Sequence, residues 1–386
     1  MTKRPKKPLR FTHLHLENWR NFTSVDVPLQ RRAFLVGPNE SGKSNFLDVF
    51  RFLHDITAAE GGFLAAVGKP WRGGFAKLKS LAARHHSDIS ICVQVGAERG
   101  PGAWEYELGF AQEAYSSPRI TSERIVMQGK VLLQRPNKVD EKDPHRLTQT
   151  YLEQSSVNRE FRGLAEFFAS VSYVHLVPQA VRNLLYSADA ENPFGGGLLR
   201  RMAELPEEER QQRLAIIGAV LRSAVPQLKE LEFWTDPSDK KPHLRVRYEH
   251  LQGTWQQEGQ LSDGTLRLIG LLWALLDGEG PVLIEEPELS LHPGVIRYLP
   301  GLFVRLGKRE RRQVIVTTHS PDLLRDEGIS LNEVLLLQPG SEGTRVSAAR
   351  DVGQIQTLVE AGIGLDEAVV PLTSPPDAQG MALTGT

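Results

Sequence analysis

The sequence predicts an α/β protein with a glycine-rich loop between a strand and a helix, a mixed central sheet, an antiparallel β subdomain and a helical insertion. Three observations lead to this prediction. A glycine-rich loop stands between an apolar strand and a helix in residues 33–53, and β-rich runs separated by turn signals occupy residues 88–135. From residue 261 onward, short apolar strands alternate with helices, which is typical of a largely parallel sheet.

The glycine-rich loop GPNESGKS matches the phosphate-loop pattern G-x-x-x-x-G-K-S in full. Its glycines allow backbone N–H groups to turn toward phosphate oxygens, Lys43 supplies a positive charge, and Ser44 supplies a hydroxyl for Mg²⁺. A chance glycine-rich turn is the alternative, but the strand before the loop and the helix after it favour nucleotide binding. The predicted nucleotide ligands are Gly37, Pro38, Asn39, Glu40, Ser41, Gly42, Lys43, Ser44 and Asn45.

Two predicted strands end in polar side chains. The run LIEEPE places Glu285 and Glu286 at the end of a buried strand, and because successive strand residues point to opposite sides, the two can take separate roles. Glu285 can hold Mg²⁺, and Glu286 can orient and deprotonate an attacking water. QVIVTTHS ends at His319, which could hydrogen-bond a γ-phosphate or that water. A solvated acidic turn and a histidine satisfied at a strand end are the alternatives. Both groups nevertheless lie at strand carboxyl ends, where open parallel sheets bind ligands.

A second helix N-terminus is predicted in LSDGTLR, residues 261–267. Ser262 is a good N-cap, and Gly264 removes side-chain bulk from the first turn of a long apolar helix. Exposed N–H groups there would form a second anion site. A capped core helix with no ligand is the alternative.

The composition is that of a soluble protein. Of 386 residues, 40% are hydrophobic and 24% charged, and no run approaches the roughly 20 apolar residues that a membrane span needs. Cys92 is the single cysteine, which excludes an internal disulfide framework, and the basic N-terminus lacks the apolar stretch of a secretory signal. We therefore expect a cytoplasmic protein with no membrane contact. Because the net charge is −1, DNA contacts would need local basic patches.

Together these motifs resemble the ABC-type ATPase heads of the SMC, RecF and OLD-like group, and closely the stand-alone AAA-family (AAA_21-like) ATPases of bacteria. They occur in the order of that group: LENWRNF, GPNESGKS, LSDGT, LIEEPE, LSLH and TTHSPDLL. The resemblance implies ATP and Mg²⁺ as cofactors and an ATP-dependent homodimer. In that dimer, Ser262 and Gly264 of one subunit contact the γ-phosphate held by the phosphate loop of the other.

The resemblance also suggests two further residues. Gln179 lies where RecF-like proteins place a glutamine that contacts the nucleotide and its metal, although a plain surface glutamine fits equally well. Arg20 could touch the nucleotide, but a surface ion pair fits it better. One departure is the pair Glu285-Glu286, where many ABC ATPases have Asp-Glu, so the geometry around the metal can differ.

The resemblance divides the chain into four expected segments. We expect an ATPase lobe with the phosphate loop at 1–87, and an antiparallel β and helical insertion subdomain at 88–254. A second ATPase lobe with the signature, the acids and the switch histidine is expected at 255–365, followed by a disordered tail at 366–386.

The function implied is an ATP-hydrolysing switch in DNA repair, recombination or anti-phage defence, acting with a separate nuclease or Toprim-like effector. The ATPase subunit of a membrane transporter is the alternative, but the long insertion between Lys43 and Ser262 and the LSDGT signature disfavour it. A self-contained nuclease is also less expected, because few residues follow Ser320. Local basic clusters make DNA contact and DNA-stimulated hydrolysis conceivable, although such clusters are more often solvated faces. The clusters comprise Lys3, Arg4, Lys6, Lys7, Arg245, Arg247, Lys308, Arg309, Arg311 and Arg312.

Overall fold

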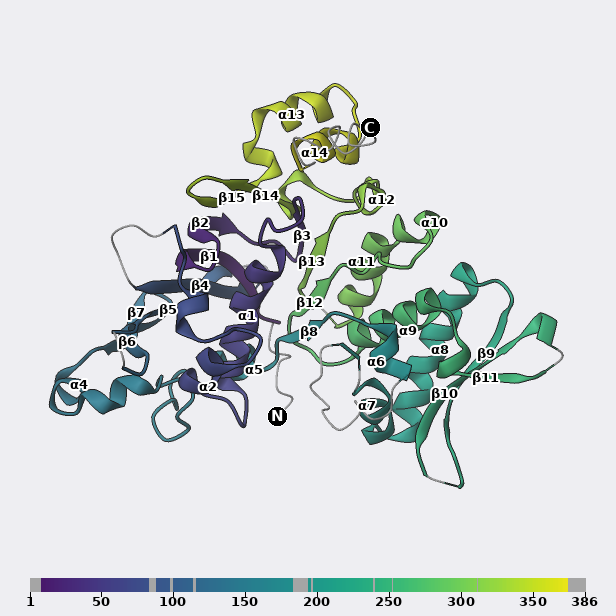
Figure 1. Cartoon of the computed structure of the whole chain (residues 1–386), viewed down its shortest axis with the longest axis horizontal. Coiled ribbons are helices and arrows are strands. Elements are labelled where there is room, and N and C mark those ends of the chain that lie inside the picture. The colour runs from purple at the N-terminus through teal and green to yellow at the C-terminus, as the bar shows by residue number, and fades with distance from the viewer. Residues whose placement is uncertain are drawn as a thin grey trace, which may run out of the picture. The chain divides into compact units, whose positions relative to one another are not determined.

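The chain folds into two compact units (Figure 1). Unit 1 comprises Met1–Ser172, Glu279–Leu283 and Arg311–Thr386, and unit 2 comprises Tyr173–Gly278 and Ile284–Glu310. The structure, a computed structural model, describes residues 8–82, 88–97, 100–113, 116–182, 194–195, 197–238, 240–251, 253–310 and 312–373. Within these residues, every helix is too short or too polar to cross a lipid bilayer.

An antiparallel sheet of six strands forms one part of unit 1. It joins two N-terminal strands to the predicted meander in the order β2-β1-β4-β5-β6-β7, so the antiparallel subdomain is confirmed and includes strands from residues 10–28. Ile89 and Ile91 of β4 are fully buried, as expected for a strand with one face on a core. Phe11 of β1 packs on Phe50 of helix α1 (Lys43–Thr57), with ring centroids 4.6 Å apart. The strands are β1 (Arg10–Trp19), β2 (Phe22–Pro28), β4 (Ile89–Ala97), β5 (Gly100–Ala111), β6 (Arg119–Met127) and β7 (Lys130–Arg135).

The predicted mixed sheet is also present, in the order β15-β14-β3-β13-β12-β8. Strand β3 runs parallel to both β13 and β14, whereas β15 runs antiparallel to β14. Every residue of β3 and β13 is buried, which is typical of parallel strands covered on both faces. The strands are β3 (Arg32–Val36), β8 (Ser172–Val174), β12 (Val282–Glu285), β13 (Val314–Thr318), β14 (Val334–Gly340) and β15 (Gly343–Ala348).

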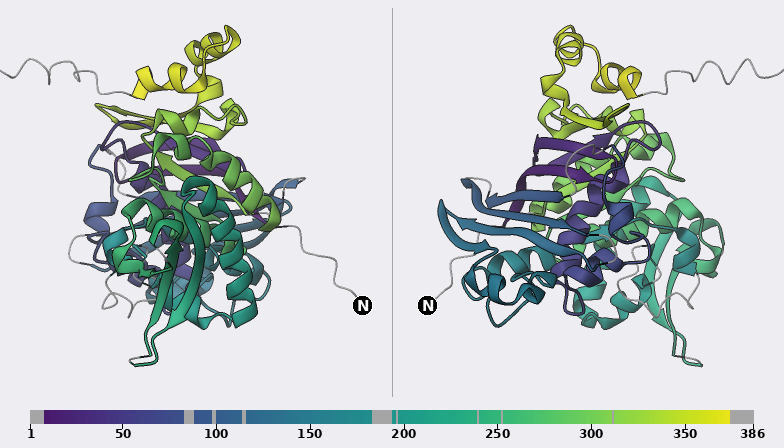
Figure 2. Two further views of the ribbon diagram at one scale, coloured as in Figure 1. Left: turned by 90° about the vertical axis from the view of Figure 1, so that its right-hand side faces the viewer. Right: turned by 60° about the vertical axis from the view of Figure 1, so that its left-hand side comes forward.

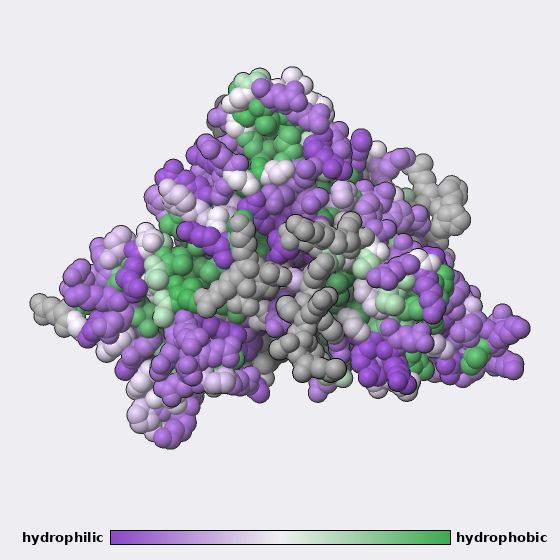
Figure 3. All heavy atoms as spheres, turned by 180° about the vertical axis from the view of Figure 1, so that it is seen from behind, coloured by the Kyte–Doolittle hydropathy of each residue, from purple (hydrophilic) through white to green (hydrophobic). Residues whose placement is uncertain are grey.

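The helices of unit 1 include a hairpin of α13 and α14 that extends beyond the β14–β15 edge of the mixed sheet (Figures 1 and 2). Apolar surface gathers on this hairpin (Figure 3), and Ile363 between its helices is 38% exposed. The helices are α1 (Lys43–Thr57), α2 (Phe63–Gly68), α3 (Phe75–Leu78), α4 (Lys138–Lys142), α5 (Arg162–Ala169), α12 (Pro321–Leu324), α13 (Gly353–Glu360) and α14 (Leu365–Thr373). Short 3₁₀ turns are η1 (Pro144–Thr148), η5 (Leu331–Glu333) and η6 (Ala349–Asp351).

Helix α14 corrects the expectation of a disordered tail over residues 366–386. Residues 366–373 are helical, with Ala368 and Val369 buried and Asp366 6% exposed beside Arg325. Pro371 inside this helix and the prolines that follow it hid the pattern in the sequence. Residues 374–386 lie outside the described residues. The four-segment division of the chain stays a prediction.

Unit 2 contains a three-stranded antiparallel sheet in the order β11-β10-β9 and a group of helices. Leu244 and Val246 of β10 are fully buried, and α8 packs against β9. The long apolar helix predicted after Ser262 is α9, in which all twelve residues from Thr265 to Leu276 are buried. The elements are α6 (Pro178–Arg182), α7 (Leu198–Glu204), α8 (Glu207–Ala224), β9 (Leu228–Thr235), β10 (Pro242–Tyr248), η3 (Glu249–Leu251), β11 (Trp255–Gln257), η4 (Glu258–Gln260), α9 (Asp263–Leu276), α10 (Pro293–Ile296) and α11 (Leu299–Glu310).

The thiol of Cys92 lies on β4, within the antiparallel sheet. It is a free cysteine and partly buried. Burial raises its pKa to about 12, and the nearby carboxylates of Glu105 and Glu107 act in the same direction. A thiol with this pKa forms very little thiolate at neutral pH. We therefore expect Cys92 to be a poor nucleophile that packs as a small apolar residue.

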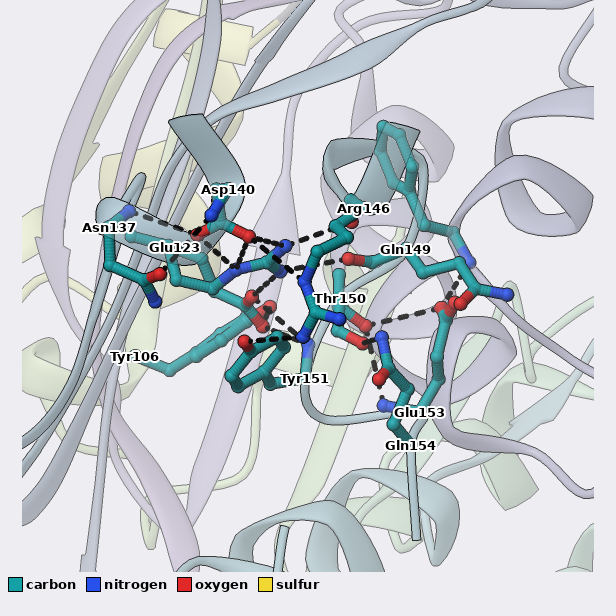
Figure 4. A network of polar contacts seen from close by, with 12 residues as sticks. Tyr106, Glu123, Asn137, Asp140, Arg146, Gln149, Thr150, Tyr151, Glu153 and Gln154 are labelled. Atoms are coloured by element: carbon teal, nitrogen blue, oxygen red, sulfur yellow. Dashed lines mark hydrogen bonds and ion pairs between the residues drawn. The ribbon is translucent and has the colours of Figure 1, made fainter. Parts of the chain in front are cut away.

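A buried network of charges lies beside β6 and β7, at one edge of the antiparallel sheet (Figure 4). Arg135 donates to Glu123 Oε2 at 2.8 Å and to Asp140 Oδ1 at 2.9 Å, and all three side chains have 0% exposure. The backbone N–H of Tyr151 donates to Glu123 at 2.9 Å. Burial raises the pKa of the Glu123 carboxyl even though the Arg135 guanidinium and the Tyr151 N–H oppose that shift.

Arg135→Met is expected to destabilise unit 1 strongly, because it leaves Glu123 and Asp140 buried without their cation. The free energy of unfolding, measured by urea titration, should fall by about 3–5 kcal/mol. Arg124→Met is the control, because Arg124 follows Glu123 on β6. Arg124 pairs with Glu105 at 2.7 Å, but both side chains are 33% exposed, so the loss should stay below about 1 kcal/mol. Equal losses in the two variants would contradict this prediction.

Candidate functional site

The phosphate loop connects β3 to α1 in unit 1, in the strand–loop–helix order that the motif predicts. Glu40 (φ 61°) and Gly42 (φ 92°) adopt the left-handed region, which turns the loop back on itself. A Cβ at Gly42 would lie 2.0 Å from Asn21 Nδ2, so only glycine fits there. Gly42 is also the N-cap of α1 and makes no side-chain capping bond. The first turn of this 15-residue helix therefore presents backbone N–H groups to an anion.

The lysine of the loop, Lys43, contacts the first two residues of the loop. Lys43 is 6% exposed, and its Nζ donates to the carbonyl oxygens of Gly37 and Pro38, each at 2.9 Å. A buried ammonium group beside an uncapped helix N-terminus fits a polyphosphate, since both features favour negative charge. The residues present in unit 1 therefore fit the phosphates of a nucleotide.

Side chains of the motif LENWRNF hydrogen-bond the phosphate loop and the first turn of α1. Asn21 Nδ2 donates to Ser41 O at 3.0 Å, and Asn21 Oδ1 accepts from Asn45 Nδ2 at 2.7 Å. Trp19 Nε1 donates to Asn45 O at 2.9 Å. Arg20 forms an ion pair with Asp48 at 2.8 Å, as the ion-pair alternative predicts, but both side chains are largely buried. Asn21 is a supporting residue that the sequence analysis missed.

His319 lies beside the phosphate loop. Strands β3 and β13 are parallel, and their last residues, Val36 and Thr318, pair with each other. Both strands therefore end at the same edge of the sheet. A cavity of about 330 Å³ opens at this edge. The structure thus brings together His319 and the start of the loop, two groups predicted from distant parts of the sequence. The cavity is lined by Val36, Gly37, Pro38, Asn39, His319, Ser320, Pro321, Leu324, Val370 and Thr373.

The signature residues lie at the N-terminus of α9 in unit 2. Ser262 Oγ accepts from Thr265 N at 3.2 Å and caps its own helix. A Cβ at Gly264 would lie 2.6 Å from Ser290 O, so glycine permits the LSLH loop to approach α9. Arg182 of α6 lies 2.6 Å from Asp263 Oδ1 and donates to Leu261 O at 2.7 Å. Gln179 is exposed on this same short helix. The contact of these residues with a nucleotide stays a prediction.

The paired glutamates follow β12. Glu285 is 11% exposed, its Oε2 accepts from the Tyr173 hydroxyl, and His175 Nδ1 lies 3.7 Å from it. Glu286 has φ 44°, so the chain leaves the strand through the left-handed region before Pro287. Within the described residues, no group of three or more His, Cys, Asp or Glu side chains forms a metal site by itself. A Mg²⁺ ion would therefore need oxygen ligands from phosphates as well, as it commonly has.

Arg267 is a buried cation beside these acids that the sequence analysis missed. It is 7% exposed, and within the described chain its Nε and Nη1 make no hydrogen bond. Burial lowers the pKa of its guanidinium, while the charges of Asp263, Glu286 and Glu288 oppose this shift. Arg267 therefore links the signature helix to the acidic loop electrostatically. Arg267 lies within the pattern of an apolar helix, and the acids Glu286 and Glu288 near it follow about twenty positions later in the sequence. The helix pattern alone therefore does not reveal its role.

The basic residues suggested for DNA contact differ in their exposure and in their partners. Arg312 is 2% exposed and donates to Gly280 O at 2.6 Å, so its assignment to a DNA-binding surface is wrong. Arg245 and Arg247 pair with Glu232 and Glu230 across the β9–β10 ladder, which neutralises their charge. Lys3, Arg4, Lys6, Lys7 and Arg311 lie outside the described residues, as do the side chains of Lys308 and Arg309.

The fold and the loop with its lysine define an ATPase of the ABC type, with a mixed sheet and an antiparallel subdomain as predicted. The chain belongs to the AAA_21 family, "AAA domain, putative AbiEii toxin, Type IV TA system", whose model matches residues 32–325. The resemblance to AAA_21-like nucleotide-binding ATPases drawn from the motifs is thereby confirmed.

Two relatives are nucleases. The chain is 30% identical to the OLD nuclease of Thermus scotoductus over 131 residues, which cover 32% of this chain and 24% of that protein. It is 36% identical to endonuclease GajA of Bacillus cereus over 55 residues, covering 14% and 10% respectively. The matched stretches thus span a quarter or less of the length of these relatives.

Two solved structures share the fold. A SmcHead bound to the C-winged helix domain of ScpA has a TM-score of 0.54 at 12% identity, covering 87% of this chain and 96% of that chain. An Smc head domain with an extended coiled coil, bound to the C-terminal domain of ScpA derived from Pyrococcus furiosus, has a TM-score of 0.50 at 11% identity. It covers 91% and 100% of the two chains. At these identities, the likeness shows the fold alone.

Gly42→Ala is expected to distort the phosphate loop, because the new Cβ would collide with Asn21 and the residue would keep a positive φ. Nucleotide affinity by calorimetry should fall by at least about tenfold, and the free energy of unfolding by more than about 1 kcal/mol. Gly163→Ala in α5 is the control, since nothing lies within 4 Å of its added Cβ. It should leave affinity unchanged and stabilise the helix by about 0.5–1 kcal/mol. Intact binding in Gly42→Ala would overturn the assigned loop geometry.

Proposed function

We propose that this protein is a cytoplasmic, ATP-hydrolysing switch that dimerises on ATP and acts with a separate effector in DNA repair, recombination or anti-phage defence. The observation that carries the proposal is the cavity in which the phosphate loop and His319 meet at one sheet edge. Membership of the AAA_21 family supports ATP hydrolysis, and the nuclease relatives support the link to DNA.

Each predicted site residue has a distinct role in this proposal. The loop N–H groups and Lys43 bind the phosphates, with Gly37 through Asn45 as the cradle. Ser44 and Glu285, with Gln179, are the residues to hold Mg²⁺, which neutralises phosphate charge when bound. Glu286 orients a water and accepts its proton, and His319 donates a hydrogen bond to the terminal phosphate. The left-handed backbone at Glu286 ends the extended conformation of β12 directly after Glu285, which suits separate roles for the two carboxylates.

The dimer of the proposal places the start of α9 of one subunit over the loop of the other. Ser262 and Gly264 would then contact the terminal phosphate, aided by the N-terminal dipole of a 14-residue helix. The close approach of Ser290 to Gly264 supports this arrangement, since it makes the signature and the LSLH segment one rigid tip. ATP would hold the two subunits together, and hydrolysis would release them.

The effector of the proposal is a nuclease or Toprim-like protein supplied in trans. Both curated relatives are named as nucleases, and the stretches that match them span a quarter or less of their length. DNA is a proposed partner that stimulates hydrolysis, with contacts outside the neutralised face of Arg245 and Arg247. Binding through phosphates would weaken steeply as salt is raised.

Glu286→Gln is expected to bind ATP but to hydrolyse it at least about a hundredfold more slowly, because the general base is lost. The ATP-bound dimer should therefore accumulate, as a shift in size-exclusion chromatography. Glu279→Gln at an exposed position before β12 is the matched control and should hydrolyse normally. Lys43→Ala should neither bind nor shift. A Glu286→Gln protein that stays monomeric and turns over ATP would remove Glu286 from the site.

Ser262→Arg is expected to spare nucleotide binding and to block the dimer, because a long cation would occupy the face that meets the other subunit. ATP turnover should drop by at least about tenfold while the affinity of the monomer, measured by calorimetry, stays within about twofold. Ser262→Ala, which removes only the cap, tests for a purely structural effect and should cost about 1 kcal/mol of stability. Normal turnover in Ser262→Arg would show that the signature assignment is wrong.

A further inference from the structure

The C-terminal helix α14 forms one wall of the nucleotide-side cavity. Val370 and Thr373 line this cavity together with Pro38, Asn39 and His319. The family match ends at residue 325, so α14 lies beyond the stretch that the family model describes. A segment added after the family core therefore reaches the place where the terminal phosphate would lie.

An ion pair fixes α14 to the helix that follows His319. Arg325, the residue after α12, lies with its Nε 2.9 Å from Asp366 Oδ2 in the first turn of α14. The Asp366 side chain is 9% exposed and that of Arg325 is 58% exposed, so an otherwise buried carboxylate is neutralised from the solvent side. The Arg325 guanidinium also binds Asp322 of α12 at 2.8 Å. One arginine thus joins α12 to α14.

The position of His319 is set from both of its ends. On one side, Thr318 is paired with Val36 in the sheet. On the other side, Ser320 occupies the N-cap position of α12, whose Leu323 and Leu324 are 0% and 1% exposed. Only His319 and Ser320 separate the strand from this helix. Helix α12 contacts α14 and begins two residues after His319. A displacement of α14 that moves α12 would therefore also move His319.

We propose that Arg325 and Asp366 are positioning residues for nucleotide hydrolysis. Their ion pair holds α14 against α12, which sets the direction of His319 and places Val370 and Thr373 beside the loop. This inference rests on the proposed function. The cradle and Lys43 hold the phosphates without help from α14, so the pair acts on the chemical step and not on binding. Its loss should therefore appear in kcat and leave KM unchanged.

The test compares Arg325→Gln and Asp366→Asn with the wild-type chain. Each should lower kcat between about tenfold and a hundredfold, the loss that follows from small misplacement of a catalytic group, with KM within about twofold. The double variant should lose no more than Arg325→Gln alone, because Arg325→Gln already breaks the contact between Arg325 and Asp366. Arg325→Lys keeps the charge and should recover most of kcat. Arg350→Gln breaks an exposed pair with Asp351 in the same unit and should change nothing.

Hydrogen exchange separates positioning from general loss of stability. Backbone amides of residues 320–325 should exchange faster in Arg325→Gln and Asp366→Asn, whereas those of β13 and β3 should stay as protected as in the wild type. Faster exchange throughout unit 1, or losses of kcat that add in the double variant, would show a structural role and overturn the inference. If the wild-type chain hydrolyses ATP and the variants match it, the inference alone fails. If the wild-type chain binds ATP and never hydrolyses it, the proposed function fails and takes the inference with it.

Discussion

One amide side chain holds together the parts on which unit 1 depends. Asn21 sits in the turn between β1 and β2, donates to Ser41 of the phosphate loop and to Thr344 of β15 at 2.8 Å, and accepts from Asn45 of α1. The antiparallel sheet, the loop and the edge of the mixed sheet therefore meet at a single group. Gly42 packs against that amide in a backbone conformation that residues with a side chain rarely adopt, and with no room for a Cβ. The loop is thus preorganised by contacts that are independent of any ligand, and preorganised donors lose little entropy when an anion binds.

Buried guanidinium groups organise the rest of this unit. Arg72 has 0% exposure and binds both Asp48 and Asp55 on α1, and Asp48 in turn pairs with Arg20. In the same way, Arg135 on β7 binds Glu123 and Asp140. Burying such groups costs free energy unless each charge meets a partner, so losing one member of either cluster would leave an unpaired buried charge. The helix behind the phosphate loop is consequently fixed by charge on one face and by aromatic packing on the other.

The sequence predicted much of the fold and the parts of the site that depend on local pattern. The phosphate loop, the capped start of α9 and the strand that ends at His319 all have signals within ten neighbouring residues, and the structure places the loop beside His319. The residues that were missed depend on partners far along the chain. Asn21 contacts Thr344, Arg325 contacts Asp366, and Arg267 faces an acidic loop that begins after another strand. Arg312 was misassigned for the same reason: a run of basic letters does not reveal that one member is covered by Ser172 and Gly280. Helix α14 was hidden because its proline outweighed its short apolar pattern.

The poor acidity of Cys92 has a practical consequence. Since the sequence holds no other cysteine, and burial raises the pKa of this one to about 12, we expect thiol-directed dyes to label the protein slowly at neutral pH. A cysteine engineered at an exposed site would therefore receive a fluorophore selectively without removal of the native one. Placed on an exposed position of the α13–α14 hairpin, such a dye would report on the surroundings of that hairpin without signal from a second labelled site.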